Sequence, residues 1–158
     1  MKSLEKRLTY LFTGEIVAVA TFTFVYCYHF SSNHSYTLLY LLLILNFILL
    51  QGSLYWFVKW RKLKTKRNVL PKLYKHLNLL RNINLTLIVL TPLILTLETV
   101  ISGLISTPRL ILIIFVLGFV IIEYINYFHI QLTNYKNGRW KKSAIAKEIH
   151  HQIFLKDR

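Results

Sequence analysis

Three of the six acidic residues lie inside long apolar stretches of the chain, where an ionised side chain is hard to accommodate. They are Glu15, Glu98 and Glu123. An ionised group at bilayer depth costs at least ~2.5–3.5 kcal/mol, so it pairs with a cation, takes up a proton or lines water. Because no Lys or Arg lies deep in the same stretches, the acids indicate either a path for protons or cations, or hydrogen bonds between helices.

Two of these acids have polar neighbours that suit proton chemistry. On a helix, Glu123, Asn126 and Tyr127 share one face, and His129 lies close by, roughly 9 Å from Glu123 along the axis. Glu15 lies roughly 12 Å along a helix from the basic residues that precede its stretch. Both acids therefore belong to the same half of the membrane and would meet across a bundle. The residues assigned to a proton path are Glu15, Glu98, Glu123, Asn126 and His129.

A structural role for the buried polar residues explains the same pattern. Asn84, Thr91 and Glu98 fall at every seventh residue and form one polar stripe along a helix. Hydrogen bonds between membrane helices contribute only ~0.6 kcal/mol on average, so Asn or Gln would serve this purpose as well as Glu. Both interpretations stay open for the acids. The residues assigned to helix packing are Asn46, Asn84, Thr91 and Ser102.

Four apolar runs are long enough to hold these residues in a membrane. The chain is 54% hydrophobic and only 16% charged, against about 25% charged residues in soluble domains. A bilayer core of ~30 Å needs about 20 apolar residues in a helix. The sequence therefore predicts an all-α membrane protein, a single domain over 1–158, with transmembrane helices at about 8–30, 36–60, 83–105 and 110–130.

The distribution of basic residues predicts how these helices are oriented. The net charge is +14, and all Lys and Arg residues except Arg109 lie in three basic segments, at 2–7, 59–81 and 136–158. The positive-inside rule places both termini, the loop 61–82 and the tail 131–158 in the cytoplasm, and it accounts for the charge without nucleic acid. The other two connections are short, which predicts two antiparallel helical hairpins. The use of Lys, Ile, Asn and Leu suggests a bacterial cell membrane.

The cytoplasmic segments carry helical patterns of their own. After Pro71, leucines recur at helical spacing and predict a short amphipathic helix that leads into the third span. From Ile145 to Ile153, isoleucines recur every four residues among lysines and predict an interfacial helix. Each Lys or Arg near an anionic surface contributes about 1 kcal/mol, so the anionic inner leaflet is an expected partner. The residues assigned to lipid contact are Trp60, Arg61, Lys62, Trp140, Lys141 and Lys142.

The sequence contains none of the short motifs that indicate a particular reaction. There is no glycine-rich phosphate loop, no HExxH and no pair of cysteines. His150 and His151 are adjacent, so they point in different directions on a helix and do not indicate a metal site. We therefore expect no catalytic residue, no metal and no cofactor.

Three functions are consistent with these features. The first is a non-enzymatic accessory, regulatory or immunity-type subunit that contacts a larger membrane protein, a second copy of itself or the lipid surface. The second is a proton-coupled small transporter or channel subunit that uses the buried glutamates. Four spans with an acid in the first resemble the architecture of the small multidrug resistance transporters, although no motif of that family beyond Glu15 is matched. The third is an enzyme that acts on lipid at the inner leaflet through Glu123 and His129.

Overall fold

The computed structural model describes residues 2–29, 35–65, 73–136 and 139–148. Four long helices run through them. They are α1 (Lys2–His29), α2 (Tyr36–Thr65), α3 (Leu73–Ser102) and α4 (Thr107–Phe128). Each contains a stretch that is long and apolar enough to cross a membrane, which confirms the four predicted helices. The first three extend beyond the apolar runs at the ends that carry basic residues.

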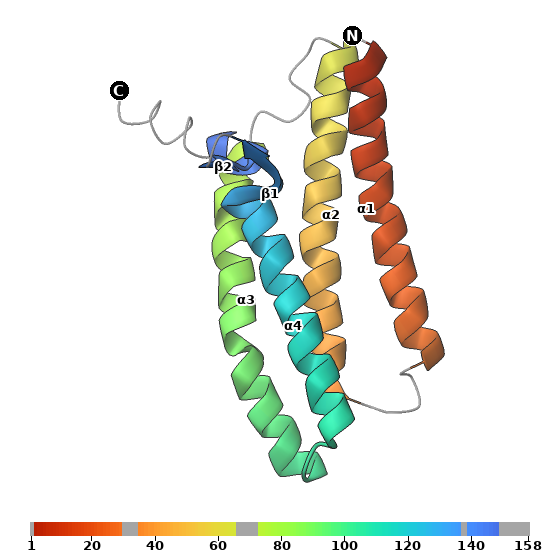
Figure 1. The fold of residues 1–158 in the computed structure, drawn as a ribbon, viewed down its shortest axis with the longest axis vertical. Helices are drawn as coiled ribbons and strands as arrows, with labels where there is room; N and C mark the ends of the chain where they lie inside the picture. Colours follow the sequence, from red (N-terminus) through yellow and green to blue (C-terminus); the bar gives the residue numbers. More distant parts are fainter. Residues whose placement is uncertain (1, 30–34, 66–72, 137–138, 149–158) are drawn as a thin grey trace.

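The second helix is the centre of the bundle. The four helices lie along the long axis of the molecule and alternate in direction (Figure 1). α2 contacts each of the other three, so its buried residues cover a broad face, and Leu39, Leu43, Leu50 and Leu54 form a narrower exposed one. Its Leu41, Ile44 and Ile48 belong to one hydrophobic core with Ile113 and Val120 of α4. Each of these five side chains is almost completely buried.

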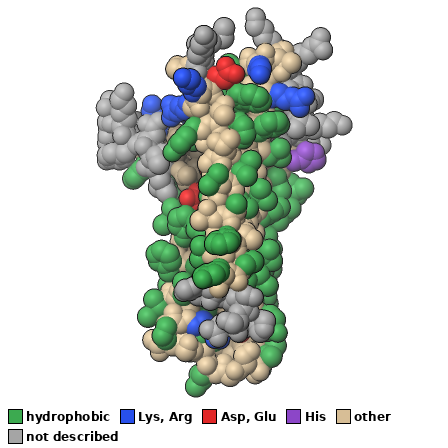
Figure 2. Space-filling model, turned by 90° about the vertical axis from the view of Figure 1, so that its right-hand side faces the viewer, with side chains coloured by type: hydrophobic (Ala, Val, Ile, Leu, Met, Phe, Trp, Pro, Cys, Tyr) green, Lys and Arg blue, Asp and Glu red, His purple; other side chains and the backbone are tan. Residues whose placement is uncertain are grey.

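One end of the bundle is basic. α1 and α3 begin at this end, and α2 and α4 finish there (Figure 1). Lys6, Arg7, Arg61 and Lys62 are exposed on it. Figure 2 shows most of the visible Lys and Arg side chains gathered here, above a surface on which hydrophobic side chains predominate. We call it the basic end, and the other the opposite end.

The helix predicted after Pro71 is the first part of α3 rather than a separate element. α3 starts at Leu73 and continues without a break into the apolar stretch. Leu77 is buried and Leu80 is half-buried against the core. The leucine face that the sequence indicated therefore packs on the bundle and lengthens the third helix at the basic end.

The chain continues from α4 into a β-hairpin, which corrects the prediction of an all-α protein. β1 (Ile130–Lys136) pairs with β2 (Arg139–Lys142) in an antiparallel register that sets the first residue of β1 opposite the last of β2. The dipeptide Asn137-Gly138 between β-branched and aromatic residues is a strong hairpin signal, and it outweighs helical spacing here. Helix returns at 144–148, and the rest of the predicted interfacial helix lies outside the described residues.

Candidate functional site

The contact between Glu15 and Tyr127 is the centre of the site. The Tyr127 hydroxyl on α4 donates a hydrogen bond to Oε1 of Glu15 on α1. Tyr127 is 7% exposed, and the indole of Trp56 on α2 also hydrogen-bonds to it. The bond therefore ties α1 to α4 across the surface of the central helix. It gives the Glu15 carboxyl a protein partner at a depth where water is scarce.

A second carboxyl group lies beside this pair. Glu123, one turn before Tyr127 on α4, is hydrogen-bonded to the side chain of Asn126. It is close enough to Glu15 for their charges to interact. The structure thus brings together Glu15, Glu123 and Asn126, three of the residues that the sequence assigned to a proton path. Two carboxyl groups that interact in an apolar surrounding favour a state in which they share a proton or a cation.

A small cavity adjoins the cluster at the basic end. Its volume is about 150 Å³. The polar side chains that line it are Glu15, Trp56, Asn126, Tyr127, Gln131 and Ser143. This volume would hold a few water molecules or a small cation, since a water occupies about 30 Å³ in the liquid. It is smaller than the ~300–1,000 Å³ of sites for larger organic ligands.

The tail covers the cavity by folding back on the end of α4. The Ser143 hydroxyl donates to the carbonyl oxygen of Tyr127 at 2.5 Å, and the Ser143 amide donates to the carbonyl of His129 at 3.1 Å. The same hydroxyl accepts from the amide of Ala146 at 3.0 Å and so caps the short helix that follows. Ile145 is 2% exposed beside it. No pattern in the sequence indicates this role of Ser143, because the role depends on the hairpin that brings the chain back to the end of α4.

His129 does not join the cluster. It is exposed at the end of α4, where its Nε2 lies 3.5 Å from the Tyr124 hydroxyl. The rings of these two residues are 5.4 Å apart. The structure therefore separates His129 from Glu15, although both lie toward the basic end.

Glu98 lies at the opposite end and binds the start of another helix. Its Oε2 accepts a hydrogen bond from the backbone amide of Thr37 at 2.7 Å, in the first turn of α2. The side chain is almost fully buried, with the hydroxyl of Ser35 nearby. The N-terminus of a helix carries unpaired amides and a positive dipole, both of which favour an anion. The geometry thus gives Glu98 a helix N-terminus as its partner, whereas the partner of Glu15 is a tyrosine hydroxyl.

The charge of Arg109 also acts on Glu98. The chain reverses direction between α3 and α4, with Gly103 at φ +80°, and this reversal returns Arg109 toward Glu98. Among the described residues, no Lys or Arg charge acts on Glu15 or Glu123 in this way.

The polar stripe of α3 faces the central helix along its whole length. Asn84, Thr91 and Glu98 are 0%, 1% and 2% exposed. Asn84 and Gln51 of α2 exchange two amide hydrogen bonds, at 2.8 and 3.2 Å. Ser102, the fourth residue in this pattern, is exposed at the end of α3. The first three positions therefore lie between α3 and α2.

Asn46 contacts a different helix. Its Nδ2 donates to the hydroxyl of Thr23 on α1 at 3.0 Å. Ser53, two turns further along α2, donates to the carbonyl of Phe12 on α1 at 3.1 Å. These bonds join α1 to α2 at two levels. The close approach between helices lies at Gly52 rather than at Gly14, since a β-carbon on Gly14 would meet no described atom within 4 Å.

The residues assigned to lipid contact all lie at the basic end. Arg61 and Lys62 are exposed near the end of α2, and Lys141 and Lys142 are exposed on β2. Trp140 is 49% exposed beside the two lysines. Trp60 is half-buried, and it packs against the rings of Phe12 and Phe57. Trp60 therefore serves the packing of α1 on α2 as well as the surface.

Neither a metal site nor a relative identifies the function. Among the described residues there is no group of three or more His, Cys, Asp or Glu side chains that could hold a metal ion. Comparison with models of protein families, with curated proteins and with solved structures finds no match. Any function must therefore be inferred from the chain's own residues.

Proposed function

We propose that this chain is a non-enzymatic accessory or regulatory subunit of a cell membrane, of the kind that includes immunity-type proteins. It acts by binding a helix of a larger membrane protein, and α1 supplies the binding surface. The observation that carries the proposal is the exposure of α1. One face of this helix packs on the bundle, while the opposite face presents a regular row of side chains without a described neighbouring helix.

Both faces of α1 have the spacing of helix-pairing seams. The packed row is Leu8, Phe12, Glu15, Val19, Phe22 and Tyr26. The exposed row is Tyr10, Gly14, Val17, Thr21, Phe24 and Tyr28. In each row the residues alternate by four and three positions, which is the seam of two helices that wind around each other.

The exposed row combines small and large residues in a way that suits a second helix. Its large members are strongly exposed: Tyr10 by 77%, Phe24 by 69% and Tyr28 by 80%. Gly14 and Thr21 lie between them and would let another backbone approach closely, as small residues do in membrane helix pairs. A face that contacted only lipid would not need small residues at these positions.

The orientation of the protein follows from its charges. The basic end lies in the cytoplasm, with both termini and the segments 61–82 and 131–158, because Lys and Arg are retained on that side. The exposed lysines near Trp60 and Trp140 then meet an anionic inner leaflet. α1 packs on α2, and the bond from Glu15 to Tyr127 of α4 adds to this packing, so together they set the direction of its exposed row.

Affinity purification after cross-linking in native membranes tests this proposal. The tagged chain is compared with Thr21→Leu, which adds bulk to the exposed row, and with Thr86→Leu on α3. The pair is matched, since each hydroxyl donates to the carbonyl four residues earlier, at 2.9 Å for Thr21 and 3.0 Å for Thr86. A larger membrane protein should be recovered with the wild type and Thr86→Leu and lost with Thr21→Leu. Recovery of the chain alone, or equal recovery with both variants, contradicts the proposal.

A second function, proton- or cation-coupled transport by an oligomer, is favoured by one observation. Glu15 and Glu123 interact next to a cavity that adjoins the basic end. A flux assay in proteoliposomes tests it, with Glu15→Gln and Glu123→Gln as the disabling variants. Glu98→Gln is the matched control, because Glu98 binds the start of α2 at the opposite end. Flux that is unchanged in the first two variants removes this function.

A further inference from the structure

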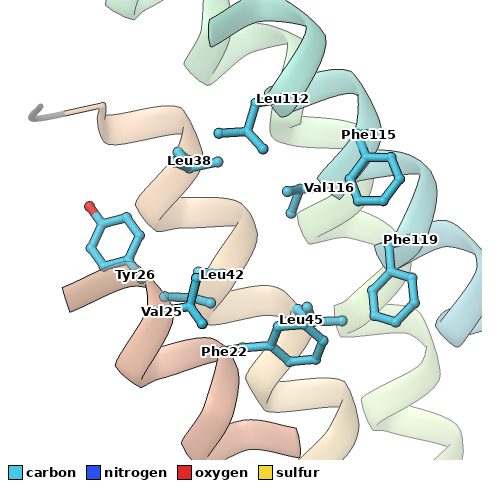
Figure 3. A pocket seen from close by; sticks show the side chains of 10 residues that line it. All are labelled: Phe22, Val25, Tyr26, Leu38, Leu42, Leu45, Leu112, Phe115, Val116 and Phe119. Atoms are coloured by element: carbon cyan, nitrogen blue, oxygen red, sulfur yellow. The ribbon is translucent and has the colours of Figure 1, made fainter. Parts of the chain in front are cut away.

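An apolar groove runs between α1 and α4 in the half of the bundle away from the cluster around Glu15 (Figure 3). Its volume is about 300 Å³. α2 forms its floor with Leu38, Leu42 and Leu45. Phe22 of α1 and Phe119 of α4 meet edge to face at the end near Leu45, with ring centroids 5.7 Å apart, and so close the groove there. The groove is independent of the exposed row of α1, because Phe22 belongs to the packed row.

The lining restricts the chemistry of anything that binds there. Every lining side chain is apolar except for the hydroxyl of Tyr26. A polar ligand would lose its hydrogen bonds to water without replacement, at a cost of several kcal/mol per group. The floor extends along α2 from Leu38 to Leu45, which is roughly 10 Å along the axis. The shape is therefore that of a slot parallel to the helices, and it suits a hydrocarbon chain.

A basic side chain, that of Arg109, lies at one end of this slot. On α4, Leu112, Val116 and Phe119 line the groove, and Arg109 precedes Leu112 by three positions on the same face. In the sequence, Arg109 is also the one Lys or Arg outside the three basic segments. A guanidinium binds phosphate oxygens well, because it offers several N–H donors in a plane.

We propose that this groove is a binding site for one acyl chain of a phospholipid, with the lipid phosphate at Arg109. The helices that form it are long and apolar enough to cross a membrane, so lipid chains surround its mouth. Those chains run parallel to the helices, as the slot does. The headgroup lies at the opposite end, so the lipid belongs to the leaflet away from the basic end.

Photolabelling in nanodiscs of defined phospholipid tests the site. The full chain is reconstituted with a trace of phosphatidylglycerol that carries a diazirine on one acyl chain, and labelled residues are identified by mass spectrometry. Labelling should concentrate on 112–119 of α4 and 22–26 of α1. It should fall when excess unlabelled phosphatidylglycerol is added, because a site saturates and a lipid-facing surface does not. The exposed residues Val100 and Ile101 of α3 give the background level.

Two variants separate the site from ordinary lipid contact. Val116→Trp fills the groove and should abolish the excess labelling, while Val100→Trp places the same ring on an 81% exposed position and should leave it unchanged. Arg109→Gln should reduce labelling by the photoactivatable phospholipid several-fold and leave labelling by a photoactivatable diacylglycerol unchanged. Equal effects on both probes overturn the phosphate contact.

The competition experiment on the wild type needs no variant, so it decides the proposal even if Val116→Trp does not fold. Labelling of the groove at the background level of α3, without competition, overturns the lipid site. Cross-links from the groove to another protein chain in place of lipid overturn it in favour of a protein occupant.

Discussion

The ring of Tyr127 on α4 occupies the space that a side chain at Gly52 on α2 would need. A β-carbon on Gly52 would lie 2.5 Å from two ring carbons and 2.8 Å from the hydroxyl oxygen. Carbon atoms in favourable contact are about 3.5–4.0 Å apart, so no larger residue fits here without movement. The glycine at position 52 therefore allows Tyr127 to reach Glu15 across the central helix.

Gly52→Ala should destabilise the protein by about 1–3 kcal/mol, because the added methyl group forces the Tyr127 ring out of its place. Unfolding in mixed detergent micelles measures this free energy. Gly14→Ala is the matched control, since its β-carbon would have no described neighbour within 4 Å. It should be neutral or raise stability by up to about 1 kcal/mol through helix propensity. Equal stability changes in the two variants would show that the close approach at Gly52 is absent.

The bond between Glu15 and Tyr127 should appear as a coupling energy in a double-mutant cycle. Tyr127→Phe removes the donor and Glu15→Leu removes the acceptor. Interhelical hydrogen bonds of this kind average ~0.6 kcal/mol and reach ~1.7 kcal/mol, so the two changes should be non-additive by about that amount. The free energy of unfolding of the wild type, both single variants and the double variant provides the measurement. Additive changes would mean that the bond contributes nothing to stability.

Replacing one amide of the pair Gln51 and Asn84 should destabilise the protein more than replacing both. Asn84→Leu leaves the buried Gln51 amide without its partner and should cost about 1–3 kcal/mol. The double replacement with leucine removes both polar groups and should recover most of that loss. Asn82→Leu, at an exposed position on the same helix, is the control and should change stability little. A double variant that is less stable than Asn84→Leu would contradict this account.

Glu98 should protect the first turn of α2 against hydrogen exchange. In Glu98→Leu the Thr37 amide loses its acceptor, so the amides at 37–39 should exchange faster and the protein should lose about 1–3 kcal/mol of stability. Glu98→Gln keeps a carbonyl oxygen in place and should show a smaller effect. Exchange rates measured by mass spectrometry over the whole chain localise the change. Unaltered protection at 37–39 in Glu98→Leu would rule out this role.

The tail should be held on the bundle mainly by an apolar contact. Ile145 is 2% exposed, so Ile145→Ala should cost about 2–5 kcal/mol or release the tail, with faster exchange at 143–148. Glu148→Gln removes the partner of Lys59, whose Nζ lies 3.5 Å from Glu148 Oε1. That pair is partly exposed to solvent, so the loss should stay below about 1 kcal/mol. A larger loss of stability in Glu148→Gln than in Ile145→Ala would show that the ion pair, rather than the apolar contact, holds the tail on the bundle.

The sequence by itself determined that four helices form and where their apolar parts lie. An apolar run of about 20 residues is a local property, and it requires a helix in a membrane whatever its neighbours are. The sequence also predicted the polar stripe of Asn84, Thr91 and Glu98, because helical geometry places every seventh residue on one face. Its burial against α2 agrees with the interpretation as helix contacts.

Only the tertiary structure decided which groups surround each acid. In the sequence, Glu15 and Glu98 are equivalent acids in apolar runs, but the packing gives Glu98 a helix N-terminus and Arg109, and gives Glu15 a tyrosine and a second carboxyl group. The central position of α2 was decided at the same level. The physical reason is that these contacts join segments far apart in the chain, and their partners depend on which helix faces meet rather than on local spacing.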